Sequence, residues 1–237
     1  MSTKPITLSI DVGGSNIKAM PLDAKGKPLA ERIKLPTPRP ATPAAVVATI
    51  AAVAAVAKKA GDFDRVSVGF PGVIRDGCVL TAVNFDGRWS GFDLQSAVQK
   101  KLAKPTRVLN DADMQGYGAI EGSGVELTVT LGTGVGSGLF VDGKLVPNLE
   151  LGHHALRKGE TYEQQLGQKA LDRVGKRRWK KRLKLAIAQI ERAFWPRRLC
   201  LGGGNARLID WKLPAGVEVV PNEYGILGGI ALWNDTK

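Results

Sequence analysis

The apolar residues of the chain follow two kinds of pattern. Short runs rich in β-branched residues predict strands, because such side chains fit a buried, pleated surface. These runs lie at residues 6–10, 17–22, 65–70, 106–109, 126–131, 139–141 and 199–201. Most of them end at glycine, proline or asparagine, which are typical of turns. The chain therefore alternates buried strands with sharp connections.

Longer segments repeat apolar residues at helical spacing. After the N-cap pair Thr42-Pro43, valines and an isoleucine recur every three or four residues until Gly61, which predicts a helix. A second helix is expected to end near Pro196. Its apolar stripe consists of Trp179, Leu183, Ala186, Ile190 and Phe194. A last helix is expected to begin near residues 223–225, so strands and helices together predict an α/β fold.

The beginning of the chain is echoed further along. A strand, a loop of glycine with serine or threonine, a second strand and a glycine turn occupy residues 6–26, and the same order returns at 127–143. This repeat predicts two similar lobes with a central cleft. We expect an N-terminal lobe over 1–109, with the first glycine-rich loop, and a C-terminal lobe over 110–237, with the second loop and a donor-binding region.

Positive charge is concentrated in one region. The chain has 34 Lys and Arg against 22 Asp and Glu, a net charge of +12. Residues 169–198 contain twelve basic and two acidic residues, so this segment carries +10 of that charge. Arg177, Lys180, Lys181 and Lys184 fall opposite the apolar stripe of the predicted helix and are expected to be exposed. Such a run is usually a solvated helix face, and it can also attract a polyanion.

Composition excludes several classes of protein. Hydrophobic residues make up 43% of 237 residues, which is enough for a sizeable core and excludes wholesale disorder. Cys78 and Cys200 are far apart and encode neither a disulfide framework nor a cysteine zinc site. We expect no signal peptide before the first strand and no membrane span. The expected protein is soluble and cytoplasmic.

The first glycine-rich loop is a candidate phosphate site. Backbone N–H groups, the serine and the asparagine could cradle phosphate oxygens, and Lys18 could add a positive charge. Asp11, at the end of a strand, could hold Mg²⁺ through water. The residues concerned are Asp11, Gly13, Gly14, Ser15, Asn16 and Lys18. Taken alone, this segment is equally typical of a plain hairpin turn.

A second loop repeats glycine at every other position. Four such glycines between 132 and 138 would weaken an ordinary strand, so a close approach of a ligand explains them better. The segment matches neither a P-loop nor a full dinucleotide fingerprint, and anion binding is favoured. Its candidate residues are Gly132, Thr133, Gly134 and Gly136. Gly202, Gly203, Gly204 and Asn205 could seat a nucleotide at a helix N-terminus or form only a tight turn.

Two further elements bring carboxylates to turns. Asn110-Asp111 lies between a predicted strand and a predicted helix, where Asp111 could be a general base for phosphoryl transfer or could only cap the helix. Local evidence favours the cap. In Glu150-Leu151-Gly152-His153, a carboxylate and an imidazole could each bind hydroxyl groups of a sugar, and a surface turn is the alternative.

Taken together, these elements resemble the ROK family of bacterial sugar kinases, within the actin-like ATPase/hexokinase superfamily of ribonuclease H-like fold. Residues 11–18 resemble the family's first phosphate motif, 131–138 its second and 201–205 its adenosine motif. The resemblance implies that Asp111 is the catalytic base for the sugar 6-hydroxyl. It also implies a set of sugar-binding residues: Pro71, Gly72, Asn84, Asn110, Glu150 and His153.

Two departures refine the resemblance. Many family members carry a cysteine-rich zinc loop after the Glu-x-Gly-His element, whereas residues 155–160 here contain no cysteine, so we expect no zinc. Repressor members carry an N-terminal DNA-binding domain, and this chain starts five residues before its first strand. The short chain and residues 146–153 look most like the polyphosphate glucokinase branch, in which a polyanion replaces or supplements ATP. A homodimer is common in such families.

Three functions follow as hypotheses. The first is a glucokinase that uses Mg²⁺ and inorganic polyphosphate, with ATP as a further donor, and in which Arg177, Lys180, Lys181 and Lys184 form a polyanion track. The second is a strictly ATP-dependent kinase for glucose, mannose or N-acetylmannosamine, favoured by residues 202–205. The third is a non-enzymatic sugar sensor or nucleic-acid-binding protein, which the core-facing Trp179 disfavours because stacking needs exposed aromatics.

Overall fold

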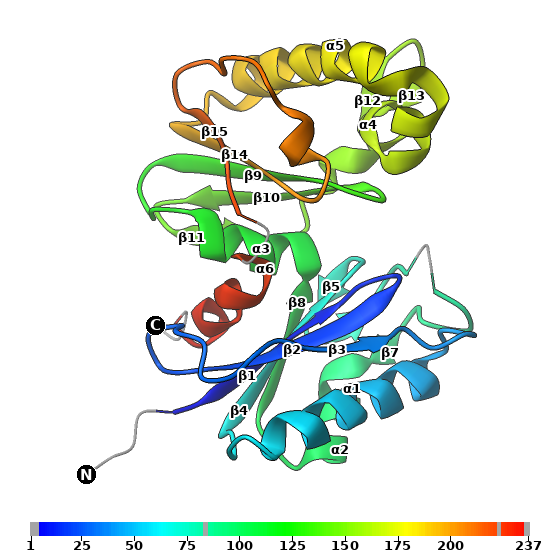
Figure 1. Ribbon diagram of the computed structural model, residues 1–237, viewed down its shortest axis with the longest axis vertical. Helices are drawn as coiled ribbons and strands as arrows, with labels where there is room; N and C mark the ends of the chain where they lie inside the picture. Colours follow the sequence, from blue (N-terminus) through cyan, green and yellow to red (C-terminus); the bar gives the residue numbers. More distant parts are fainter. Residues whose placement is uncertain (1–4, 83–84, 222–223, 235–237) are drawn as a thin grey trace. The chain divides into compact units, whose positions relative to one another are not determined.

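Two compact units make up the chain (Figure 1). The computed structural model describes residues 5–82, 85–221 and 224–234. Contacts group residues 1–118 with 225–237 as the first unit and residues 119–224 as the second unit. The residues after 224 therefore belong to the first unit by contacts, whereas the division predicted at 109/110 groups them with the C-terminal lobe. The functional lobes expected from the sequence stay a prediction.

The first unit is built on a five-stranded sheet in the order β3-β2-β1-β4-β8. Its strands are β1 (Thr7–Val12), β2 (Asn16–Leu22), β3 (Ile33–Pro36), β4 (Arg65–Phe70) and β8 (Thr106–Asn110). β1 is antiparallel to β2 and parallel to β4. A small sheet is formed by β5 (Ile74–Arg75), β6 (Cys78–Val79) and β7 (Phe92–Asp93). The predicted first hairpin is confirmed, and the short β3 adds an edge strand that the pattern did not indicate.

The two faces of this sheet are covered differently. Leu8, Ile10 and Val12 alternate onto one face and share a core with α1 (Pro43–Lys58) and α2 (Leu94–Leu102). Figure 1 shows both helices on the same side of the sheet. On the other face, the Ser9 hydroxyl donates to the Ile226 carbonyl at 2.6 Å. This second face is therefore where the end of the chain packs, as α6 (Tyr224–Leu227) and the 3₁₀ helix Gly228–Trp233.

The second unit repeats the same sheet order, β11-β10-β9-β14-β15. Its strands are β9 (Val125–Leu131), β10 (Val135–Val141), β11 (Lys144–Val146), β14 (Arg198–Gly202) and β15 (Val217–Val219). β9 is antiparallel to β10 and parallel to β14, as β1 is to β2 and β4. The predicted pair of similar lobes is confirmed by this repeat of order and direction.

The remaining elements connect and cover these sheets. They are α3 (Asp111–Ala119), the 3₁₀ helices Leu151–His153 and Ala206–Leu208, β12 (Ala155–Arg157), β13 (Glu160–Thr161), α4 (Tyr162–Leu166) and α5 (Gln168–Phe194). The apolar stripe predicted on α5 is buried as far as Ile190, although α5 begins earlier than its stripe and is interrupted at Gly175, where φ is 74°. No helix within the described residues combines the length and apolarity that a bilayer crossing requires.

Candidate active site

Two carboxylates lie at neighbouring strand ends of the first unit. In the parallel pairing, Asp11 at the end of β1 is opposite Gly69 of β4. A Cβ atom on Gly69 would lie 2.6 Å from the Met114 methyl group and 3.3 Å from the Asp111 Cα. Glycine at this position therefore lets the start of α3 pack directly on β4. Asp11 and Asp111 thus both lie next to Gly69, at the carboxyl ends of the parallel strands β1, β4 and β8, which is where parallel strands hold ligands.

Asn110 is the residue that caps α3. Its Oδ1 accepts hydrogen bonds from the N–H groups of Ala112 at 2.8 Å and Asp113 at 3.1 Å. Its Nδ2 donates to the Gly72 carbonyl at 3.0 Å, which joins two sugar-site elements predicted from the sequence. The Asp111 Oδ1 also lies 2.9 Å from the Ala112 nitrogen. Because Asn110 supplies the cap, capping alone does not account for a carboxylate at Asp111.

The first glycine-rich loop is held by the segment that follows β3. The Thr37 hydroxyl donates to the Gly13 carbonyl at 2.6 Å, and the Thr37 N–H donates to the Ser15 carbonyl at 3.0 Å. Lys18 forms an ion pair with Asp11 at 2.9 Å. The loop is therefore more than a free hairpin turn, since a separate segment fixes its carbonyl groups.

The second loop is joined to the predicted nucleotide element. Asn205 donates its N–H to the Leu131 carbonyl at 2.9 Å and its side-chain Nδ2 to the Gly132 carbonyl at 3.3 Å. The N–H of Gln168, the first residue of α5, also donates to the Gly132 carbonyl, at 3.0 Å. The structure thus brings residues 131–134 and 202–205 together within the second unit.

Three glycines have no structural need to be glycine. Around Gly14, Gly132 and Gly204, an added Cβ would meet no atom within 4 Å, and none of the three has the positive φ that favours glycine. They lie in the first loop, the second loop and the nucleotide element, one in each. A bare backbone with open space in front of it permits close approach of a ligand such as phosphate.

A carboxylate cluster lies beside the second loop. The Glu150 carboxylate is 3.4 Å from the His153 Nε2. Burial raises the pKa of Glu150, His153 lowers it, and the nearby Glu163 raises it again. Glu163 also accepts a hydrogen bond from the Val135 N–H at 3.2 Å and lies against Gly134. Glu163 was not predicted, because a glutamate in the first turn of a helix is ordinary and only the fold shows what it faces.

Ser137 fixes the segment that carries Glu150. Its hydroxyl donates to the Leu149 carbonyl and accepts the Leu151 N–H at 3.2 Å, so it holds the residues on both sides of Glu150. A Cβ on Gly152 would clash with the Val135 carbonyl, so this turn packs directly on β10. Glu150 and His153 are therefore positioned by the strand that leaves the second loop.

Replacing Ser137 with alanine should raise the Michaelis constant for the sugar several-fold with little change in kcat. The variant leaves a buried carbonyl and a buried N–H without their partner, which costs about 1–3 kcal/mol and loosens the segment around Glu150. Steady-state kinetics in sugar concentration measures this. Thr128→Val is the matched control, because it also removes a buried hydroxyl bonded to β10, at Gly138, without touching Glu150. An unchanged Michaelis constant in Ser137→Ala would argue against this positioning role.

The basic residues of α5 are only partly free. Lys180 forms an ion pair with Asp210, and the Lys184 ammonium lies 5.0 Å from the centre of the Trp211 ring. Arg177 and Lys181 are exposed as predicted, whereas Lys180 is half-buried. Trp179 is fully buried, and its indole N–H donates to the Leu166 carbonyl. It cannot stack on a base, which argues against nucleic-acid binding through this helix.

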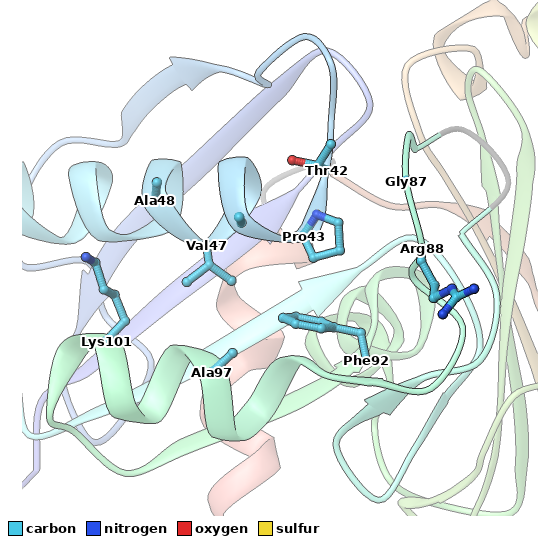
Figure 2. A pocket seen from close by; sticks show the side chains of 10 residues that line it. Thr42, Pro43, Val47, Ala48, Gly87, Arg88, Phe92, Ala97 and Lys101 are labelled. Atoms are coloured by element: carbon cyan, nitrogen blue, oxygen red, sulfur yellow. The ribbon is translucent and has the colours of Figure 1, made fainter.

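A surface pocket of about 660 Å³ lies in the first unit, beside α1 and α2 (Figure 2). It is bordered by α1, α2 and the segment at residues 87–88, and Val47 and Phe92 form part of its apolar wall. Arg88 and Lys101 are its charged lining residues. The lining contains no carboxylate and no imidazole, so this pocket offers no group for acid–base catalysis.

Two further predictions from the sequence concern Asn84 and a bound metal ion. Asn84, expected to hold the sugar, lies outside the described residues. Among the residues that are described, no three His, Cys, Asp or Glu side chains are grouped so as to hold a metal ion by themselves.

Comparisons with known proteins show which family the chain resembles. The model of the ROK family matches residues 7–161. The polyphosphate glucokinase of Mycobacterium leprae is 36% identical over 236 residues, covering 92% of this chain and 72% of that protein. The Mycobacterium tuberculosis (strain CDC 1551 / Oshkosh) polyphosphate glucokinase is also 36% identical, covering 92% and 88%. The crystal structure of an inorganic polyphosphate/ATP-glucomannokinase from Arthrobacter sp. strain KM has a TM-score of 0.86 at 35% identity, covering 97% of this chain and 99% of that one.

The chain therefore belongs to the ROK family, and it has the actin-like ATPase/hexokinase fold. These relatives place it among the sugar kinases of the family, which are phosphotransferases. Both the family and the fold predicted from the sequence are confirmed.

Proposed function

We propose that the protein is a glucokinase that transfers a phosphoryl group from inorganic polyphosphate to the 6-hydroxyl of glucose. The observation that carries this proposal is the set of open glycines, Gly14, Gly132 and Gly204, at positions where neither a close contact nor a positive φ requires glycine. Loops of this kind suit a phosphorylated donor. The choice of glucose and polyphosphate is supported by the relatives named above, each about a third identical over nearly the whole chain.

Asp111 is the proposed general base. Phosphoryl transfer needs little covalent chemistry from the protein, so positioning, charge stabilisation and removal of the hydroxyl proton are its main tasks. The Asp111 carboxylate would accept the proton of the 6-hydroxyl as that oxygen attacks the terminal phosphorus. Asp111 is the first residue of α3, and Gly69 beneath its Cα and the Asn110 cap fix the start of that helix.

Mg²⁺ fits the residues of the first unit. Asp11 offers a half-buried carboxylate at a strand end beside the first loop, and carboxylate oxygens are ligands that Mg²⁺ prefers, with water and phosphate oxygens completing the set. Asp11 would hold the ion through water, and the ion would neutralise negative charge on the donor phosphates. Lys18, which pairs with Asp11, would add a positive charge at the same place.

The remaining predicted residues divide between sugar and donor. Glu150 would accept hydrogen bonds from sugar hydroxyls and His153 would donate or accept them, with Glu163, which is close to Glu150, as a further carboxylate. Pro71, Gly72, Asn84 and Asn110 are proposed to complete the sugar site. The backbone N–H groups of residues 13–16 and 132–136 would bind phosphate oxygens. Assembly as a homodimer and a cytoplasmic location stay predictions.

ATP is a second candidate donor. The element at 202–205 remains packed on the second loop through Asn205, and Gly204 remains open to a ligand. This arrangement leaves room for a nucleotide beside the second loop. The Arthrobacter relative is itself named for both donors.

A donor and sugar panel tests the function. The purified chain would be incubated with glucose, mannose or N-acetylmannosamine, each with polyphosphate or with ATP, and sugar 6-phosphate would be measured. The proposal expects glucose phosphorylation with polyphosphate. Turnover with ATP alone would overturn the choice of donor, and turnover of another sugar in place of glucose would overturn the choice of acceptor.

A further inference from the structure

A row of charged residues crosses one face of the first sheet. In the strand registers, Lys34 of β3 is opposite Lys18 of β2, Lys18 is opposite Asp11 of β1, and Asp11 is opposite Gly69 of β4. Residues opposite one another on neighbouring strands project from the same face of a sheet. Lys34, Lys18 and Asp11 therefore form a line that runs from the free edge of the sheet toward Gly69.

This face is the one on which Asp111 lies. A Cβ on Gly69 would point at α3 and come within 3.3 Å of the Asp111 Cα. Ile33 and Leu35, which flank Lys34 in β3, pack instead against the core on the opposite face with α1. The alternation of β3 thus assigns Lys34 to the face of Asp111. The row connects an exposed sheet edge with the proposed catalytic carboxylate.

Lys34, the outer member of the row, and the nearby Arg39 keep uncompensated positive charge. Lys18 is neutralised by Asp11, at 2.9 Å. Lys34 is exposed, and within the described residues it forms no ion pair. Arg39 is also exposed, and its guanidinium donates to the Gly14 carbonyl at 2.8 Å. A second cation therefore stands at the rim of the first phosphate loop.

We infer that Lys34 and Arg39, with Lys18 between them and the reacting centre, bind the polyphosphate chain beyond the phosphate that is transferred. We call these three residues the basic edge. This inference rests on the proposed function, and it adds the surface along which a long polyphosphate donor binds. Two of the four basic α5 residues, Lys180 and Lys184, are less suited, because Asp210 and Trp211 already engage them. A polyanion gains most from exposed cations that have no carboxylate partner.

The basic edge distinguishes donors by their length. A long polyphosphate carries negative charge past the first loop and can reach Lys34. ATP ends in a nucleoside, and tripolyphosphate ends after three phosphates. Only the long donor should therefore depend on Lys34.

The test compares donors of different length on charge variants of the full chain. Lys34→Glu should raise the Michaelis constant for long-chain polyphosphate about fivefold at low salt, since one surface ion contact is lost and reversed. The constants for ATP, tripolyphosphate and glucose should stay within about twofold of wild type. Lys34→Ala should also lower the slope of log affinity for polyphosphate against log salt by about 0.7, as for one contact to a flexible polyanion. Arg39→Lys keeps the charge and should retain more of the affinity than Arg39→Ala.

A matched control lies on the equivalent strand of the second unit. Lys144 is an exposed lysine of the edge strand β11, paired with Val141 beside the hairpin turn and not beside the second loop. Lys144→Glu makes the same charge change and should leave polyphosphate use unchanged. Lys181→Glu, on α5, should raise the Michaelis constant for long-chain polyphosphate less than Lys34→Glu does.

The outcomes separate the inference from the proposed function. Selective weakening of long polyphosphate by Lys34→Glu supports the basic edge. Suppose that the wild type uses polyphosphate. If Lys34→Glu leaves the Michaelis constant for long-chain polyphosphate unchanged, or if Lys181→Glu raises it more, the basic edge is overturned while the donor assignment stands. Wild-type turnover with ATP alone overturns the donor assignment, and the basic edge with it.

Discussion

Replacement of Asp111 with asparagine should lower kcat about 10²- to 10⁴-fold, the range expected when a general base is lost. Asparagine has the shape of aspartate and keeps an acceptor oxygen for the Ala112 N–H, so the start of α3 should remain intact. It cannot accept the proton of the sugar hydroxyl. Steady-state kinetics with saturating donor and sugar measures the loss, and sugar binding by calorimetry should stay close to that of the wild type.

Asp93→Asn is the matched control for Asp111→Asn. Asp93 is the N-cap of α2 in the same unit, and its carboxylate accepts the Ser96 N–H at 2.8 Å. The substitution makes the same chemical change at a helix start, and asparagine is an equally good cap. Activity should be unaffected. If Asp111→Asn were no less active than Asp93→Asn, Asp111 would not be the base.

The features that could be predicted from the sequence are those that a short run of neighbouring residues determines by itself. A β-branched run followed by glycine, serine and asparagine makes a strand that ends in a tight loop, wherever it occurs. The two hairpins at β1-β2 and β9-β10 are of this kind, and their resemblance led to the prediction of two similar lobes. The element at Asn110-Asp111 could be located for the same reason, although its local chemistry favoured a helix cap at the aspartate. The structure gives that task to Asn110.

The features that could not be predicted depend on contacts between distant residues. The edge strand β3 has only four residues, too few for a clear alternation, and its place beside β2 comes from register. Glu163 is separated by 28 residues from the Val135 N–H that it binds. Nothing near either residue in the sequence indicates that contact. The return of residues 225–234 to the first unit is of the same kind, since it depends on Ser9 and Ser67 more than 150 residues earlier.

That return suggests how α3 is held. Ser67 donates its hydroxyl to the Gly229 carbonyl at 2.6 Å and accepts the Trp233 indole N–H at 2.8 Å. The Trp233 ring contacts both Arg65 and Arg107, whose guanidinium carbons are 4.9 and 4.6 Å from its centre. Gly229 and Trp233 are thus attached to β4, and Gly228, which directly precedes them, packs against α3. The segment therefore acts as a strap over the helix that carries Asp111.

Gly228→Ala should destabilise the protein by about 3 kcal/mol, at the upper end of the usual cost of overpacking. Its Cβ would clash with the Met114 carbonyl oxygen and lie 3.0 Å from the Gly118 nitrogen, both of them backbone atoms of α3 that cannot rotate away. For a chain of this length the melting temperature should fall by about 6–12 °C, measured by thermal unfolding. Gly204→Ala is the stability control, because its Cβ meets nothing within 4 Å, and it should shift unfolding little.

The same variant should separate positioning from binding. If the strap holds α3 in register with β4, folded Gly228→Ala protein below its melting temperature should show a lower kcat, because Asp111 is displaced, with a nearly unchanged Michaelis constant for glucose. Ser67→Ala offers a milder form of the same change, since it loosens the strap without inserting an atom against α3. A fall in stability with kcat intact in both variants would mean that the strap supports the fold but does not position Asp111.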